Sequence, residues 1–105
     1  MNIFDIFIAY VSWGNNGKRR PVLIIRQGVN NARVFNITTR YESKSEVIRS
    51  KYFKIVDWKQ AGLDRQSYVD TNDTITLPIS SVDVKHPVGK LTQSDKNNLI
   101  EFIIK

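Results

Sequence analysis

The sequence predicts a mainly β domain in which a small, strongly curved antiparallel sheet carries a C-terminal helix over one opening. Three segments in the first forty residues have strand-like composition and are joined by short turns rich in glycine and asparagine. The last dozen residues instead place apolar side chains at helical spacing. A sheet this small hides its apolar face most readily by closing on itself, so a barrel-like arrangement is expected.

The first three strands should form an antiparallel meander. Residues 5–13 are apolar on both alternating faces, which is typical of a buried strand. A glycine and asparagine loop is expected at residues 14–19, followed by a strand over residues 20–27 that tolerates Pro21 because the proline stands at its beginning. The third strand is predicted over residues 32–40.

The middle of the chain is less patterned. Residues 45–51 are compatible with a short helix or with a loop, and the pattern does not decide between them. Strand composition follows at residues 52–58, and a helical turn closed by Gly62 comes next. Residues 67–80 return to strand composition with a break near residues 70–73.

The terminal helix is the best-defined element and is predicted over residues 93–104. Thr92 followed by Asp95 is a weak capping box at its start. Leu99, Phe102 and Ile103 are expected to share its buried face.

Composition limits the class of protein. A chain of 105 residues with 41% hydrophobic content supports one core, so residues 1–105 are expected to form a single domain. No apolar run approaches the roughly 20 residues of a membrane span, and the first residues lack a basic leader, so we expect a cytoplasmic protein with no membrane contact. With no cysteine and the single histidine His86, neither a metal site nor a cofactor is expected.

Positive charge is concentrated in the first part of the chain. Of the net +6, residues 1–60 carry eleven Lys and Arg against four acids, whereas residues 61–105 carry five against six. A basic face of this kind attracts phosphates or other anionic surfaces, although solubility alone would also explain it.

Two short motifs concentrate the candidate functional residues. In the first, Lys18, Arg19 and Arg20 precede Pro21 and a buried strand, so a rigid strand would hold the last guanidinium where charge develops in a reaction. In the second, Thr38, Thr39 and Arg40 end the third strand, and a hydroxyl beside a guanidinium suits a phosphoryl oxygen. Taken alone, the first motif is better explained as a charged turn before a strand, and the second as ordinary strand composition.

Aromatic side chains and the histidine offer further candidates. Five aromatic residues could stack on unpaired bases, although most should belong to the core: Tyr10, Trp13, Tyr41, Tyr52 and Trp58. Trp13, at the lip of the loop at residues 14–19, is the first candidate among them. His86 is either a proton shuttle or a packed or solvated loop residue.

Taken in order, five landmarks resemble the MazF/PemK family of bacterial toxin ribonucleases. They are a first strand running into a glycine-rich loop, "RPVLII", "NIT", "DWKQAGLDRQSYV" and "VGKLTQSD", and they span essentially the whole chain. The resemblance implies a small SH3-like barrel, shared with the CcdB gyrase poisons, that forms a homodimer with a groove for single-stranded RNA. It also implies a cognate antitoxin that lies across this groove, and a mobile loop at residues 14–19 that closes over RNA.

The resemblance assigns cleavage to Arg20 and Thr38, and with it Lys18 and Arg19 are expected to guide the RNA backbone. Trp13, Thr39 and Arg40, singled out above from the residues themselves, complete the predicted RNA-binding set. It implies a sequence-specific, metal-independent endoribonuclease, in which the 2′-hydroxyl of the RNA attacks the adjacent phosphorus. Some relatives place a further arginine and an acid on the strand where this chain has Thr74 and Thr76; here Asp73 is either a substitute for the acid or a turn residue. The proton acceptor is left open between His86 and the RNA phosphate.

Two other classes of function remain open at this point. One is a CcdB-like poison that binds a protein target and cuts nothing. The other is a non-catalytic nucleic-acid-binding barrel.

Overall fold

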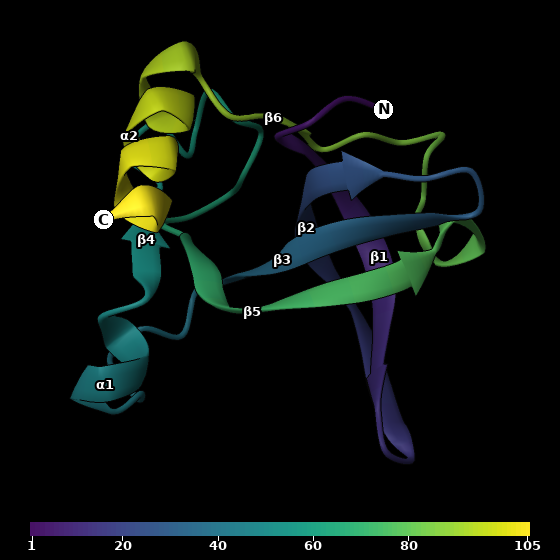
Figure 1. Cartoon of the computed structure of the whole chain (residues 1–105), viewed down its shortest axis with the longest axis horizontal. Helices are drawn as coiled ribbons and strands as arrows, with labels where there is room; N and C mark the ends of the chain where they lie inside the picture. Colours follow the sequence, from purple (N-terminus) through teal and green to yellow (C-terminus); the bar gives the residue numbers. More distant parts are fainter.

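The strands of the computed structural model, which describes residues 1–105, form one curled sheet beside a C-terminal helix (Figure 1). The strands are β1 (Asp5–Trp13), β2 (Asn16–Gln27), β3 (Asn31–Thr38), β4 (Tyr52–Lys54), β5 (Tyr68–Pro78) and β6 (Gly89–Lys90). The helices are α1 (Glu46–Arg49), α2 (Gln93–Ile104) and the short 3-10 turn η1 (Ile79–Ser81). No helix has both the length and the apolar character to cross a membrane.

The sheet is antiparallel throughout, with the strand order β4-β5-β3-β2-β1-β6. The predicted meander of the first three strands is therefore confirmed, as is the mainly β fold with a C-terminal helix. The sequence did not predict β6, a two-residue strand that pairs with Asp5 and Ile6 of β1.

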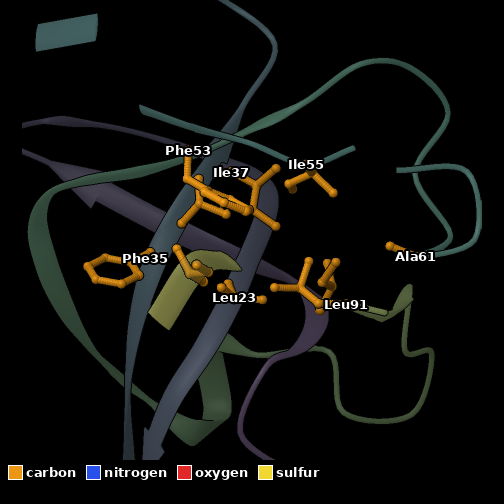
Figure 2. Packing of buried hydrophobic residues seen from close by; sticks show 10 residues of the cluster. Leu23, Phe35, Ile37, Phe53, Ile55, Ala61 and Leu91 are labelled. Carbon is orange, nitrogen blue, oxygen red and sulfur yellow. The ribbon is translucent and has the colours of Figure 1, made fainter. Parts of the chain in front are cut away.

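The sheet buries apolar side chains on both faces. Along β2, Leu23 belongs to the cluster that also contains Leu99 of α2, whereas Val22 and Ile24 belong to a second cluster on the opposite face. Figure 2 shows side chains of the first cluster from several strands converging on one another. The continuous apolar run of β2 follows from this two-sided burial.

The predicted loop at residues 14–19 is wrong, because most of it is strand. The β1–β2 ladder continues to Trp13 opposite Asn16, so that only Gly14 and Asn15 form the turn. Gly14 has φ of 56°, as the first position of a II′ hairpin turn requires. Lys18 and Arg19 consequently lie in a two-stranded ribbon with β1.

Pro21 lies inside β2 and not at its start. It is paired with Ile8 in the β1–β2 ladder, whereas the β2–β3 ladder begins only at Val22, opposite Asn36. A proline has no N–H to extend that second ladder. Before Pro21, therefore, residues 16–20 of β2 are paired with β1 alone.

The middle of the chain resolves the open alternatives. Residues 46–49 form the helix α1, whose N-cap Ser45 accepts a hydrogen bond from the Ile48 N–H at 3.3 Å. Gly62, with φ of 91°, ends the predicted helical turn. The predicted break near residues 70–73 is an irregularity within the continuous strand β5, where the pairing with β3 jumps from Val34↔Ile75 to Asn36↔Asp70.

The helix α2 has the predicted bounds, but its start is held differently from a capping box. The Thr92 hydroxyl accepts from the Asp95 N–H at 3.3 Å. The buried Asp95 carboxylate accepts from the Val56 and Asp57 N–H groups, at 3.2 and 2.8 Å, and so ties α2 to the segment after β4. Ile103 is 45% exposed, so the prediction that it shares the buried face with Leu99 is wrong.

Candidate functional site

The register of the sheet places the two predicted cleavage residues opposite each other. In the β2–β3 ladder, Leu23 faces Phe35 and Val22 faces Asn36. The same register continued by two residues sets Arg20 opposite Thr38, at the place where the ladder has already ended. Because side chains alternate between faces, both residues point to the same side of the sheet.

The same face carries three further polar groups. Asn36 is paired with Asp70 of β5, and Asp70 with Tyr52 of β4. The register therefore aligns an amide, a carboxylate and a phenol across three neighbouring strands, beside the Arg20 and Thr38 positions.

These residues line a single open cavity of about 370 Å³. Only three of its 15 lining residues are hydrophobic. The predicted RNA-binding residue Thr39 also belongs to the lining. The cations of the lining outnumber the acids; they are Lys18, Arg19, Arg20, Arg40 and Lys44, against Asp64 and Asp70. A polar, positively charged cavity of this size suits an anionic ligand.

Arg20 is held in place without being neutralised. Its guanidinium lies over the ring of Trp13, with 5.5 Å between the Cζ atom and the ring centroid. Arg20 forms no salt bridge, and its buried Nε has no hydrogen-bond partner. Such a guanidinium remains available to an anion.

A second buried polar atom without a partner lies on the same face. It is Oδ1 of Asn36. Buried polar atoms in folded proteins almost always have partners. Two orphaned atoms on neighbouring same-face positions mark a place where atoms of a ligand would complete the hydrogen bonding.

Thr38 is the last residue of β3, and its side chain bonds to the backbone just after the strand. Its Oγ1 accepts from the Arg40 N–H at 3.1 Å. The hydroxyl proton is not used by this bond, so the group can still donate to an oxygen in the cavity.

Sequence reasoning missed several cavity residues, among them Asn36, Tyr52 and Asp70. Burial raises the pKa of the Tyr52 phenol above its usual value, and the nearby Asp70 carboxylate adds to this, while Arg20 opposes it. Oδ1 of Asp70 accepts from the N–H and the side-chain amide of Asn72, both at 2.9 Å. Asp73 does not line the cavity; its carboxylate accepts from the adjacent Thr74 N–H at 2.9 Å, as in a turn residue.

Two tyrosines close to Tyr52 stack on one another. Tyr41 and Tyr68 are stacked with 4.4 Å between their ring centroids, and Arg49 lies 5.4 Å from the Tyr41 centroid. Trp13 stays half exposed beside this site. Trp58 packs partly buried against the first core cluster, as expected for a core aromatic.

His86 lies outside the cavity, in an exposed cluster with Arg19 and Asp83. Its Nδ1 is 3.1 Å from the Asp83 carboxylate, and Arg19 reaches the same carboxylate at 3.5 Å. The hydrogen bond with His86 is the main cause that lowers the pKa of Asp83. His86 is therefore not placed to move a proton in the cavity, and Arg19 lines the cavity rim while its guanidinium is paired elsewhere.

No group of three or more His, Cys, Asp or Glu side chains gathers in the structure in a way that could hold a metal ion.

Neither a protein-family model nor a curated protein matches the sequence. Among solved structures, the chain matches the Mycobacterium tuberculosis toxin MazF-mt6 with a TM-score of 0.71 and 27% sequence identity. The match covers 94% of this chain and 91% of the toxin, so the two share one fold over nearly their whole length.

Proposed function

We propose that this chain, a MazF-like toxin by its fold and its sequence landmarks, is an endoribonuclease that cuts single-stranded RNA. The observation that carries the proposal is the cavity that Arg20 and Thr38 line together. The excess of cations in this cavity suits a phosphodiester backbone. The Arg20 Nε–H has no partner in the protein and can donate a hydrogen bond to a phosphate oxygen.

The reaction we propose takes its nucleophile from the substrate. The 2′-hydroxyl oxygen bonds to the adjacent phosphorus, and the bond from phosphorus to the 5′-oxygen of the next nucleotide breaks. The products are a 2′,3′-cyclic phosphate and a free 5′-hydroxyl, with one proton leaving the 2′-oxygen and one reaching the 5′-oxygen. This route requires no metal ion.

Arg20 and Thr38 act on the phosphate in this scheme. The guanidinium of Arg20 neutralises the negative charge that builds on the pentavalent phosphorus, and Trp13 keeps it in place. The Thr38 hydroxyl donates to a non-bridging oxygen, while its bond with the Arg40 N–H fixes the orientation of the side chain.

Asp70 is our candidate for the proton acceptor. It is a carboxylate within the cavity, whereas arginine does not give up its proton and His86 lies outside. Tyr52, whose pKa is raised, stays protonated at neutral pH and can donate a hydrogen bond to an oxygen of the RNA.

The resemblance also leads us to propose a homodimer, recognition of a base sequence, a cytoplasmic location and neutralisation by a cognate antitoxin. The cation-rich cavity supports the last of these, because an acidic antitoxin segment would compete with RNA for it. The exposed side chains of Ile100, Ile103 and Ile104 on α2 offer an apolar surface for a second copy.

The chemistry is tested by incubating the purified protein with RNA of mixed sequence in excess EDTA. Cutting should persist, should leave cyclic phosphate ends, and should stop when a 2′-deoxy nucleotide replaces the residue before the cut. Cutting of the deoxy substrate would contradict attack by the 2′-hydroxyl. Failure to cut any RNA would contradict the proposal that the protein is an endoribonuclease.

The role of Arg20 is tested by Arg20→Ala, with the exposed Lys59→Gln as a control for the loss of one positive charge. Loss of one preorganised donor should lower kcat by about 10²–10³. The control should cut at the wild-type rate. If Arg20→Ala instead keeps its full toxicity in cells, a protein target of the CcdB kind becomes the better explanation.

A further inference from the structure

The far end of the sheet carries two arginines directly opposite each other. Arg26 of β2 is paired with Arg33 of β3, and Arg33 is paired in turn with Thr76 of β5. Both arginines are exposed, and neither forms a salt bridge. We call this row of three residues the Arg26–Arg33 rung.

A β-bulge creates this pairing. Ile24 is opposite Val34, but Arg26 is already opposite Arg33, which leaves Ile25 as the extra residue. Without the bulge, Arg26 would face Ala32 and point to the same side as the buried Ile24. Bulges commonly re-aim a side chain in this manner, and here the bulge brings two guanidiniums to one face.

Like charges directly opposite on neighbouring strands destabilise a sheet unless something neutralises them. The rung borders an open depression of about 270 Å³ whose lining contains neither a carboxylate nor a hydrophobic residue. Its remaining members are Gly28 and Asn31. An anion bound between the guanidiniums would turn their repulsion into a shared attraction.

The donors around the depression suit a phosphate group in particular. Guanidiniums bind phosphate oxygens in a bidentate manner, and the Thr76 hydroxyl and the Asn31 amide can add donors. Gly28 leaves room for the Asn31 side chain, since a Cβ at position 28 would lie 2.7 Å from Asn31 Oδ1.

We propose that the Arg26–Arg33 rung is a second phosphate-binding site, which holds a backbone phosphate of RNA outside the cleavage cavity. Arg26 is six residues beyond Arg20, roughly 20 Å along β2 at about 3.3 Å per residue, and it faces the opposite side of the sheet. The rung therefore cannot reach the phosphate that is cut. That the phosphate belongs to RNA rests on the proposed function, whereas the anion site itself does not.

The anion site is tested by following the arginine Nε–H signals in NMR spectra while inorganic phosphate replaces chloride at constant ionic strength. The Arg26 and Arg33 signals should shift together and saturate. In Arg33→Gln the Arg26 signal should no longer respond, and the melting temperature without phosphate should be at least that of the wild type. No shift, or an unchanged Arg26 response in Arg33→Gln, would overturn the site.

The RNA assignment is tested by the affinity for a single-stranded 2′-O-methyl RNA, which cannot be cut by the 2′-hydroxyl route. Loss of one phosphate contact should weaken binding about 8-fold near 50 mM salt and reduce the salt slope by about 0.7. We expect this of Arg26→Gln/Arg33→Gln but not of Lys59→Gln/Lys85→Gln, which removes the same charge from exposed positions elsewhere. Equal weakening in both pairs, or a response to inorganic phosphate alone, would overturn the assignment to RNA.

This design separates the second site from the proposed function. If the protein binds the 2′-O-methyl RNA through the rung but cuts no RNA, the proposed function fails and the rung stands. If the protein is active, Arg26→Gln/Arg33→Gln should raise KM for long RNA, with kcat unchanged and with cleavage of a trinucleotide unaffected.

Discussion

At position 20, a single guanidinium combines firm placement with a missing partner. Its ring contact with Trp13 orients it, yet no carboxylate pairs with it. Trp13, which the sequence suggested as a platform for an RNA base, has at least one other task in the folded chain, because its ring positions the arginine.

The Tyr52 phenol should make the stability of the protein depend on pH at the alkaline end. Because its pKa is raised, its contribution is complete below the unfolded value of 10.0 and is lost as pH rises through the folded pKa. As pH rises above about 10, wild-type protein should therefore lose melting temperature more steeply than Tyr52→Phe. Tyr10→Phe, at a half-exposed position on β1, is the matched control and should follow the wild type. Parallel curves for wild type and Tyr52→Phe would refute the effect.

Arg20 and Thr38 were accessible to sequence reasoning because a recognisable motif carries each of them. Asp70 and Tyr52 could not be found in this way, because the side of the sheet to which they point depends on the irregular pairing of β5 with β3 and on the pairing of β4 with β5. Without that register, Asp70 and Asp73 look equally suited to the cavity. A side-chain period of two makes the choice of face sensitive to every bulge.

Among the elements, the start of α2 depends on one buried carboxylate. Asp95→Ala would leave the Val56 and Asp57 N–H groups without their acceptor, which should lower the free energy of unfolding by about 2–4 kcal/mol. Urea unfolding at neutral pH measures this loss. The exposed neighbour Ser94→Ala should change stability little, and a similar loss in both variants would show that the carboxylate is not the cause.

Two glycines with positive φ allow backbone strain to be separated from crowding. Gly14 has φ of 56° and open space around it, whereas Gly62 has φ of 91° and faces the Val88 carbonyl at close contact. Gly14→Ala should cost about 1–2 kcal/mol of stability, because alanine disfavours the left-handed backbone conformation and no neighbouring atom crowds its Cβ. Gly62→Ala should cost clearly more, and chemical denaturation of both variants checks the order. An equal cost would mean that the segment at residues 88–89 gives way freely.

The elements predicted well were those whose signals are local. The bounds of α2 follow from its cap and its spacing, and the meander follows from alternating strands and turns. The hairpin of β1 and β2 was mispredicted because "GNNGKR" has loop composition, while the pairing that makes it a strand is supplied by β1. The strand β6 had no local signal, since two residues gain their conformation from Asp5 and Ile6 alone.

For the whole molecule, the concentration of charge should make RNA binding strongly dependent on salt. Five cations line the cavity, and each phosphate contact on a single strand contributes about −0.7 to the slope of log K against log salt. With one phosphate for each cation, the cavity should give a slope of roughly −3.5 for 2′-O-methyl RNA, measured by fluorescence anisotropy, and the Arg26–Arg33 rung should add about −0.7. A slope near zero would mean that the basic surface is not the binding surface.

The register that aligns the Arg20 position with the Thr38 position also constrains how chains of this kind can vary in length. A single inserted or deleted residue between Arg20 and Val22 would rotate the guanidinium to the far side of the sheet and abolish the cavity. The same change at the Gly14–Asn15 turn would leave the residue pairs of the β1–β2 ladder in register. Natural insertions and deletions in related chains should therefore gather at that hairpin tip, far from the residues whose alternation the chemistry requires.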